Sequence, residues 1–223
     1  MRLQNSEDRE RIKKDIENGI PGWDNFIDFA GWENIIVTGV KYEKNRIAVG
    51  KTLLEYADAV GKDKYDALFD LIYEDENGAS LVDFYGKEEH IERFMQREEM
   101  NLCTDGLMAN EMPHPRVYGS FPRMLGKYCR EEKVISLEDA VYKMTNKAAL
   151  AMGLKNRGLL KEGYYADIVL FDFKTIIDKG SYTEPKQYPE GILYVMVNGC
   201  FVIKNGKETG ERPGMVMRRN VIC

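Results

Sequence analysis

The stretch between residues 101 and 123 holds the side chains of this sequence that are best suited to chemistry. Asp105 follows the apolar run at 100–103 and precedes Gly106, a pattern typical of a buried strand that ends in a turn. A carboxylate at the C-terminal end of a barrel strand can be catalytic, because such strand ends line the active site. An Asp-Gly pair also suits an ordinary turn for backbone reasons alone, and this second interpretation stays open.

A histidine and an arginine follow in a stiff loop. Pro113 and Pro115 bracket His114, and Arg116 comes directly after them. Each proline fixes its own φ and restricts the residue before it. A guanidinium that is already oriented loses less entropy when it binds a carboxylate through two parallel hydrogen bonds. Arg116 and His114 are therefore candidates for substrate binding, although an arginine paired with Glu111 would give the same sequence pattern.

The rest of the sequence predicts the elements that would position these residues. A β-rich run predicts a buried strand at 34–38. Amphipathic spacing and capping residues predict helices at 6–18, 53–60, 63–73 and 88–98, one from Ser120 through Cys129, and one from Ser136 to Gly153. In the helix at 88–98, Ile91, Phe94 and Met95 are expected to face inward. After Gly158, short β segments are expected at 167–171, 191–198 and 201–204, with a type I′ turn at Asn198 and Gly199.

Composition restricts the possible partners and compartments. The chain has 43% hydrophobic residues, and its net charge of −5 is spread along the sequence, which argues against nucleic acid or an anionic membrane as a partner. No apolar run approaches the roughly 18 residues that would span a bilayer, and the first residues do not resemble a signal peptide. We therefore expect a cytoplasmic protein.

The potential metal ligands are few and scattered. The four cysteines, Cys103, Cys129, Cys200 and Cys223, have no ligand spacing and are expected to be reduced, with most of them, Cys103 included, serving as packing residues. The two histidines are His90, expected to be a solvated helix residue, and His114. Catalytic zinc commonly takes three protein ligands. The sequence therefore predicts no metal ligands in this chain.

Long motifs resemble the N-acyl-D-amino acid deacylases (D-aminoacylases) of the metal-dependent amidohydrolase superfamily. The similarity extends from about Trp32 to Arg218, and one departure is Met112, where the family pattern has a histidine. The motifs that carry it lie at residues 104–106, 113–126, 136–145, 157–163, 166–172, 188–192, 197–199 and 209–214.

This resemblance implies a fold and an activity. The fold would be α/β: the C-terminal part of a (β/α)8 barrel at 1–157 with a helical insertion at about 41–98, then strands of a small β-sandwich at 158–223. The activity would be hydrolysis of the amide bond of N-acyl-D-amino acids by water activated on a divalent metal, zinc in the family. Asp105 would act as general acid and base.

The family's metal ligands lie outside the part that this sequence matches. We therefore expect this chain to be a C-terminal half that binds no metal and is inactive alone, and that associates with an N-terminal half or with itself. The alternative is a truncated or split half that acts only as a structural or complementing subunit. An amidohydrolase acting on cyclic amides is disfavoured by the loop at 113–116 and by the Tyr-Pro-Glu-Gly segment at 188–191.

Overall fold

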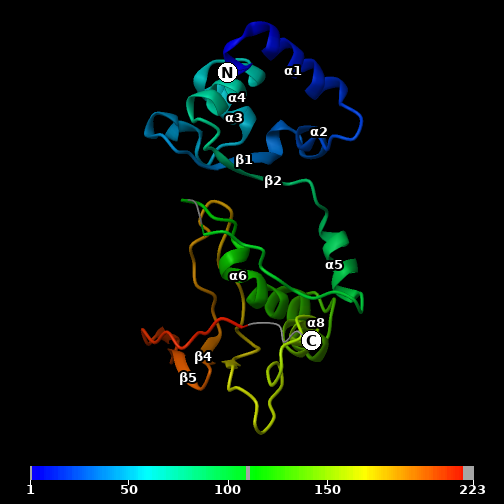
Figure 1. The fold of residues 1–223 in the computed structure, drawn as a ribbon, viewed down its shortest axis with the longest axis vertical. Coiled ribbons are helices and arrows are strands. Elements are labelled where there is room, and N and C mark those ends of the chain that lie inside the picture. Colours follow the sequence, from blue (N-terminus) through cyan, green and yellow to red (C-terminus); the bar gives the residue numbers. More distant parts are fainter. Residues whose placement is uncertain (1, 109–110, 218–223) are drawn as a thin grey trace, which may run out of the picture. The chain divides into compact units, whose positions relative to one another are not determined.

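The structure, a computed structural model, describes residues 2–108 and 111–217, which form two compact units (Figure 1). Unit 1 comprises residues 1–87 and 107–114, and unit 2 comprises residues 88–106 and 115–223. Each unit has its own hydrophobic core. The division expected from the sequence, 1–157 and 158–223, stays a prediction, and Cys223 and Arg218 lie outside the described residues.

Unit 1 is mostly helical and has one small sheet. Its elements are η1 (Arg2–Gln4), α1 (Ser6–Asn18), α2 (Phe26–Ala30), η2 (Trp32–Asn34), β1 (Ile35–Gly39), η3 (Glu43–Ala48), α3 (Leu53–Val60), α4 (Lys64–Glu74) and β2 (Ser80–Asp83). Strand β1 pairs with β2 in antiparallel register, with Val37 opposite Leu81. Helix α3 begins with the expected capping box of Thr52 and Glu55 and ends at Gly61, which is left-handed. The predicted strand at 34–38 and the predicted helices of this unit are confirmed.

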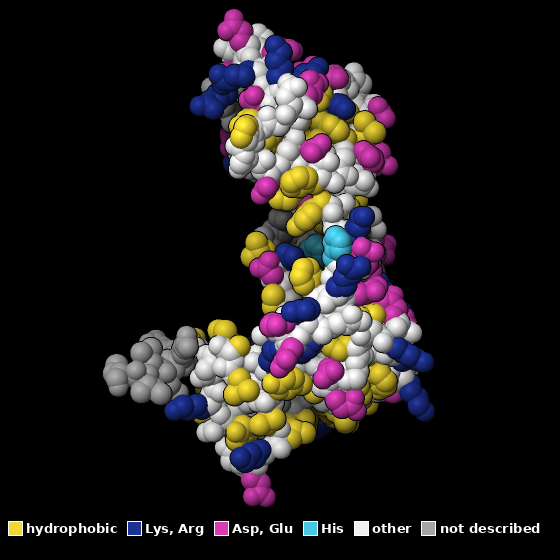
Figure 2. Space-filling model, turned by 90° about the vertical axis from the view of Figure 1, so that its right-hand side faces the viewer, with side chains coloured by type: hydrophobic (Ala, Val, Ile, Leu, Met, Phe, Trp, Pro, Cys, Tyr) yellow, Lys and Arg dark blue, Asp and Glu magenta, His cyan; other side chains and the backbone are white. Residues whose placement is uncertain are grey.

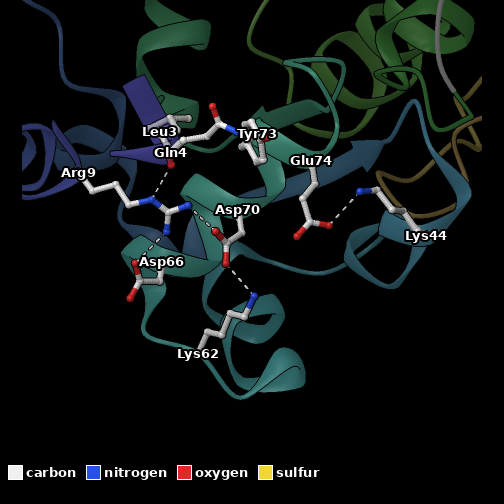
Figure 3. Close-up of polar contacts among 9 residues, drawn as sticks. All are labelled: Leu3, Gln4, Arg9, Lys44, Lys62, Asp66, Asp70, Tyr73 and Glu74. Carbon is white, nitrogen blue, oxygen red and sulfur yellow. Dashed lines mark hydrogen bonds and ion pairs between the residues drawn. The ribbon is translucent and has the colours of Figure 1, made fainter. Parts of the chain in front are cut away.

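The charged helix α1 packs against the core of unit 1 and is joined to α4 by ion pairs. Ile12 and Ile16 pack against the core of unit 1. Arg9 of α1 forms ion pairs with Asp66 at 3.1 Å and Asp70 at 2.5 Å (Figure 3). Asp70 also pairs with Lys62 at 2.7 Å, so one carboxylate is shared between two cations. Helix α1 is therefore fastened by its apolar stripe and by the network around Arg9.

Unit 2 combines helices with a four-stranded sheet. Its elements are α5 (Glu88–Gln96), α6 (Arg116–Arg123), the π-helical segment η4 (Met124–Glu131), α7 (Leu137–Met144), α8 (Asn146–Ala151), β3 (Ile168–Phe171), β4 (Ile192–Val197), β5 (Cys200–Lys204) and β6 (Lys207–Glu208). The sheet order is β3-β4-β5-β6, and every neighbouring pair is antiparallel. The turn between β4 and β5 has positive φ at Asn198 and Gly199, as expected.

Hydrogen bonds at both ends of α5 help to hold this helix in unit 2. Glu88, at its start, accepts hydrogen bonds from Lys127 Nζ and from the hydroxyl of Tyr128. Lys143 of α7 is buried and donates from Nζ to the backbone carbonyl oxygens of Met95 and Arg97, where it neutralises the negative end of α5. The segment that leads to Asp105 therefore leaves α5 from a fixed point.

Several sequence expectations are wrong in unit 2. Residues 100–103 do not form a strand, because no strand of the described residues pairs with them. Ile91 and Phe94 of α5 are exposed, and only Met95 is buried among the three residues expected to face inward. Helix α6 begins at Arg116 rather than at Ser120. Ser136 caps α7 as expected, but the helix is interrupted at Thr145 before α8.

The fold class is mixed α/β, as expected, with antiparallel sheets. The assignment of these elements to a barrel and to a β-sandwich stays a prediction. Within the described part of the chain, no helix is both long and apolar enough to cross a membrane.

Candidate active site

Asp105 lies at the end of an extended segment that rests on the core of unit 2. From Met100 to Gly106 the residues alternate between half-buried and exposed, as in an extended chain with one face against the protein. Met100 and Leu102 pack against the core of the unit. Asp105 has a φ of +41°, in the left-handed region, and its side chain is 86% exposed. The carboxylate thus points into solvent from an irregular segment, and neither the expected strand nor the expected turn is formed at residues 100–106.

Gly106 lies against Val117 in the first turn of α6. A methyl group at Gly106 would lie 2.6 Å from Cγ2 of Val117, so glycine is needed for this close approach. As a result Asp105 Oδ2 lies 3.7 Å from Arg116 Nη2, and the arginine side chain is 43% exposed. An exposed ion pair at this distance contributes little to stability. Both side chains thus face one another while they remain partly or largely exposed to solvent.

Arg116 is the first residue of α6, and the proline before it helps to start the helix. Pro115 has φ −59° and ψ −18°, and its carbonyl oxygen accepts hydrogen bonds from the backbone N–H groups of Tyr118 and Gly119, both at 3.0 Å. The hydroxyl of Ser120 donates to the carbonyl oxygen of Arg116 at 2.8 Å. The backbone of Arg116 is thus held in a regular first turn, while its guanidinium stays at the surface.

His114 belongs to the other unit. It is half-buried and follows Met112, whose N–H donates to the carbonyl oxygen of Thr38 in β1 at 3.3 Å. In the same unit Glu111 accepts a hydrogen bond from Arg46 Nη2 at 2.5 Å. The structure thus brings Asp105 and Arg116 together within unit 2 and places His114 in unit 1. The role expected for His114 in substrate binding stays a prediction.

The residues that the structure describes do not come together as a catalytic metal site. Among residues 2–108 and 111–217, no three His, Cys, Asp or Glu side chains come together in a group that could hold a metal ion. His90 is exposed, as expected, and its Nε2 lies 3.7 Å from Oε1 of Glu89. Catalytic zinc commonly takes three protein ligands, so Asp105 and Arg116 cannot hold one by themselves.

The described cysteines are free thiols, as expected, but only one of them is a buried packing residue. Cys129 is buried, and its burial, together with the charge of Glu138, raises its pKa to about 11. Cys103 and Cys200 are exposed, so the expectation that Cys103 is a buried packing residue is wrong. Cys103 is exposed because it occupies an outward position in the alternating segment before Asp105.

Sequence reasoning also missed the contact of Gly106 with Val117, because this contact joins two separate segments and appears only in the structure.

Comparisons with known proteins agree with the resemblance. The model of the amidohydrolase family matches residues 95–203, which include all three candidate residues. The chain is 38% identical over 170 residues to the D-aminoacylase of Alcaligenes xylosoxydans xylosoxydans, and 40% identical over 142 residues to the N-acyl-D-glutamate deacylase of that organism. These matches cover 76% and 64% of this chain, and 34% and 29% of the two relatives.

Solved structures give the same result. A D-aminoacylase studied for its binuclear metal centre matches 80% of this chain with 36% identity and a TM-score of 0.72. This chain belongs to the D-aminoacylase family. The N-acyl-D-glutamate deacylase of Bordetella bronchiseptica, solved with zinc and a phosphonate mimic of the tetrahedral intermediate, matches 88% of the chain with 30% identity and a TM-score of 0.72.

The match to the D-aminoacylase family covers only part of the relatives. The chain spans about a third of the length of the curated D-aminoacylases and deacylases that it matches, between 29% and 38% of each. It covers 36% and 42% of the two solved structures.

Proposed function

We propose that this chain supplies the acid–base and carboxylate-binding part of a hydrolase that cleaves the amide bond of N-acyl-D-amino acids. The observation that carries the proposal is the pairing of Asp105 with Arg116 at 3.7 Å, in exposed positions of a region that the family model matches. The chemistry of an N-acyl amino acid supports it. The nitrogen of its amide and its carboxylate are attached to the same carbon, so the groups that act on them must be neighbours.

In this proposal Asp105 exchanges a proton and Arg116 binds charge. The Asp105 carboxylate takes a proton from the attacking water and returns it to the nitrogen of the leaving amino acid, a role that requires hydrogen-bond reach to both atoms. The guanidinium of Arg116 binds the carboxylate of the substrate through parallel N–H donors, which lysine could not reproduce. No step is assigned to a metal, because the described residues do not form its site.

The second candidate is a structural or complementing subunit without turnover of its own. The lack of a metal-ligand group among the described residues favours it. In this case the chain would contribute its surface and its fold to an assembly whose chemistry lies in another polypeptide.

One experiment separates the two candidates. This chain is co-expressed with the part of the Alcaligenes D-aminoacylase that lies outside the matched region, and the product is called the assembled pair. We expect the assembled pair to hydrolyse N-acetyl-D-amino acids in preference to their carboxamides, whereas this chain alone, even with added zinc, stays inactive. A preference that disappears in Arg116→Gln supports the role of the guanidinium. Turnover by the chain alone, or no carboxylate preference in the assembled pair, would contradict the proposal.

A further inference from the structure

The segment at residues 176–180, called the docking segment, lies along one face of α6. The contacts on the helix side are made by Pro115, Gly119 and Arg123, which are four residues apart and therefore lie on one face of the helix. This face begins one residue before Arg116. The docking segment thus contacts the helix turn from which the candidate carboxylate-binding side chain projects.

The contact between the two segments is close. A methyl group at Gly119 would lie 2.6 Å from the Cβ of Asp178, and one at Gly180 would lie 3.4 Å from the Cβ of Pro115. Asp178 Oδ2 lies 3.1 Å from Arg123 Nη1, and the Asp178 side chain is only 10% exposed. The glycine at position 119 allows the approach, and the ion pair fixes the position of the helix along the segment.

The docking segment is itself anchored in unit 2. Ile176 is buried in the core. Ile177 and Glu190 exchange two backbone hydrogen bonds, of 3.0 Å and 3.4 Å, just before β4. Arg130 of η4 donates to the carbonyl oxygen of Phe173 at 3.1 Å and also to that of Ile176. Helix α6 therefore rests on a support that is tied to the sheet and to η4.

We propose that Asp178 is a positioning residue for Arg116. Through its ion pair with Arg123 and its contact with Gly119, it fixes the axis of α6, and it thereby sets where the Arg116 guanidinium lies relative to Asp105. This inference rests on the proposed function of Arg116, because a position matters only if the guanidinium binds a substrate group. Removal of the Asp178 charge leaves Arg123 without this partner and lets the first turns of α6 shift.

The test compares Asp178→Asn with a matched control in the same region. Asn keeps the shape of the side chain beside Gly119 but weakens the pairing with Arg123. The control is Glu190→Gln, which removes the exposed ion pair between Lys179 Nζ and Glu190 Oε1 at 2.9 Å while leaving its backbone bonds to Ile177 intact. Arg123→Lys serves as the conservative variant, since it keeps a cation beside Asp178.

Two readouts are used. In the assembled pair, we expect Asp178→Asn to raise KM for N-acetyl-D-amino acids about tenfold, roughly 1.4 kcal/mol of binding free energy, with little change in kcat and none in either constant for the carboxamides. Arg123→Lys and Glu190→Gln should keep KM close to the wild-type value.

The second readout is amide hydrogen exchange in this chain alone. Exchange at residues 115–123 should become faster in Asp178→Asn, while exchange in unit 1 stays the same.

The inference is overturned if Asp178→Asn leaves both KM and the hydrogen exchange at residues 115–123 unchanged. It is also overturned if hydrogen exchange becomes faster across the whole of unit 2 and kcat falls as well, because Asp178 would then be only a structural residue. Failure of the proposed function gives a different result. In that case the wild-type assembled pair shows no carboxylate preference, and the exchange measurement on this chain alone still decides whether Asp178 positions α6.

Discussion

At the scale of single residues, the most constrained carboxylate of unit 1 has no part in the candidate site. Asp75 is fully buried and accepts hydrogen bonds from the backbone N–H of Lys41 at 2.8 Å, that of Tyr42 at 3.0 Å and the Asn45 amide at 2.9 Å. Burial alone would raise the pKa of Asp75, but these hydrogen bonds together hold its pKa below the ordinary value. Asp75 thus fixes the loop after β1 to the end of α4.

This arrangement predicts a pH-dependent loss of stability. Because the folded-state pKa is lowered, the charged carboxylate stabilises unit 1 above its ordinary pKa of about 3.9, and this contribution disappears as the pH falls toward the folded-state pKa. We expect Asp75→Ala to lower the free energy of unfolding at pH 7 by about 2 to 4 kcal/mol, since three donors lose their acceptor.

Urea unfolding of the wild-type chain and of Asp75→Ala at pH 7 and at pH 3 measures this effect. The difference in the free energy of unfolding between the two proteins should be smaller at pH 3 than at pH 7. The control is Glu76→Gln, whose exposed carboxylate pairs with Lys41 and should leave the unfolding midpoint unchanged. An equal difference at both pH values would contradict the role given to the charge.

At the scale of elements, the π-helical segment η4 depends on a glycine. A methyl group at Gly126 would lie 2.4 Å from the carbonyl oxygen of Ile176 and 2.6 Å from Cδ1 of Ile177. Pro122 precedes this segment inside α6, where its missing N–H removes a helical hydrogen bond. The wider turns of η4 begin just after this proline, at Met124. Such turns are common where the regular hydrogen-bond pattern of a helix is interrupted.

Substitution of this glycine should therefore destabilise unit 2, although alanine is the better helix former. We expect Gly126→Ala to cost about 1 to 3 kcal/mol, because the methyl group displaces the backbone of the docking segment. Gly214→Ala is the matched control in the same unit, since a methyl group there meets open space. Thermal unfolding of both variants checks this, and an unchanged melting temperature for Gly126→Ala would show that the segment adapts freely.

The elements that the sequence predicted well are those specified by local signals. The capping box at Thr52 and the turn at Asn198 and Gly199 satisfy backbone groups within a few residues, so their structure follows from nearby side chains. The apolar run at 100–103 has the composition of a strand, but a strand also needs a paired neighbour, which the run itself cannot specify.

For the candidate active site, the sequence predicted which residues take part but not how they come together. The types of Asp105 and Arg116 and the motifs around them identified both residues as candidates. Their approach to 3.7 Å depends on the contact between Gly106 and Val117 and on the start of α6 at Arg116, and neither follows from local signals. Asp178 carried no sequence signal, because its partner lies 55 residues away.

At the scale of the whole chain, each unit exposes large hydrophobic side chains (Figure 2). In unit 2, β3 is at the edge of the sheet, and Val169 and Leu170 are each 53% exposed. In unit 1, Phe26 and Phe29 are 48% and 53% exposed, and Phe26 also contacts Tyr85 edge-on. Edge strands and clustered apolar side chains favour association with another chain.

We therefore expect this chain to self-associate or to bind a complementary polypeptide. Sedimentation velocity over a dilution series should show species larger than the 25.7 kDa chain, and a dye that binds apolar surface should fluoresce with it. Self-association of the chain and dye fluorescence should both decrease when the chain is in the assembled pair. A stable monomer at micromolar concentration that binds no dye would refute this prediction.

The central claim is that Asp105 transfers protons in amide hydrolysis, and Asp105→Asn in the assembled pair tests it most directly. The amide keeps the size of the side chain and removes its basicity. We expect kcat for N-acetyl-D-amino acids to fall by at least about 100-fold, with bound metal, hydrogen exchange and substrate KM close to those of the wild-type pair. An Asp105→Asn pair that keeps most of its kcat would contradict the account.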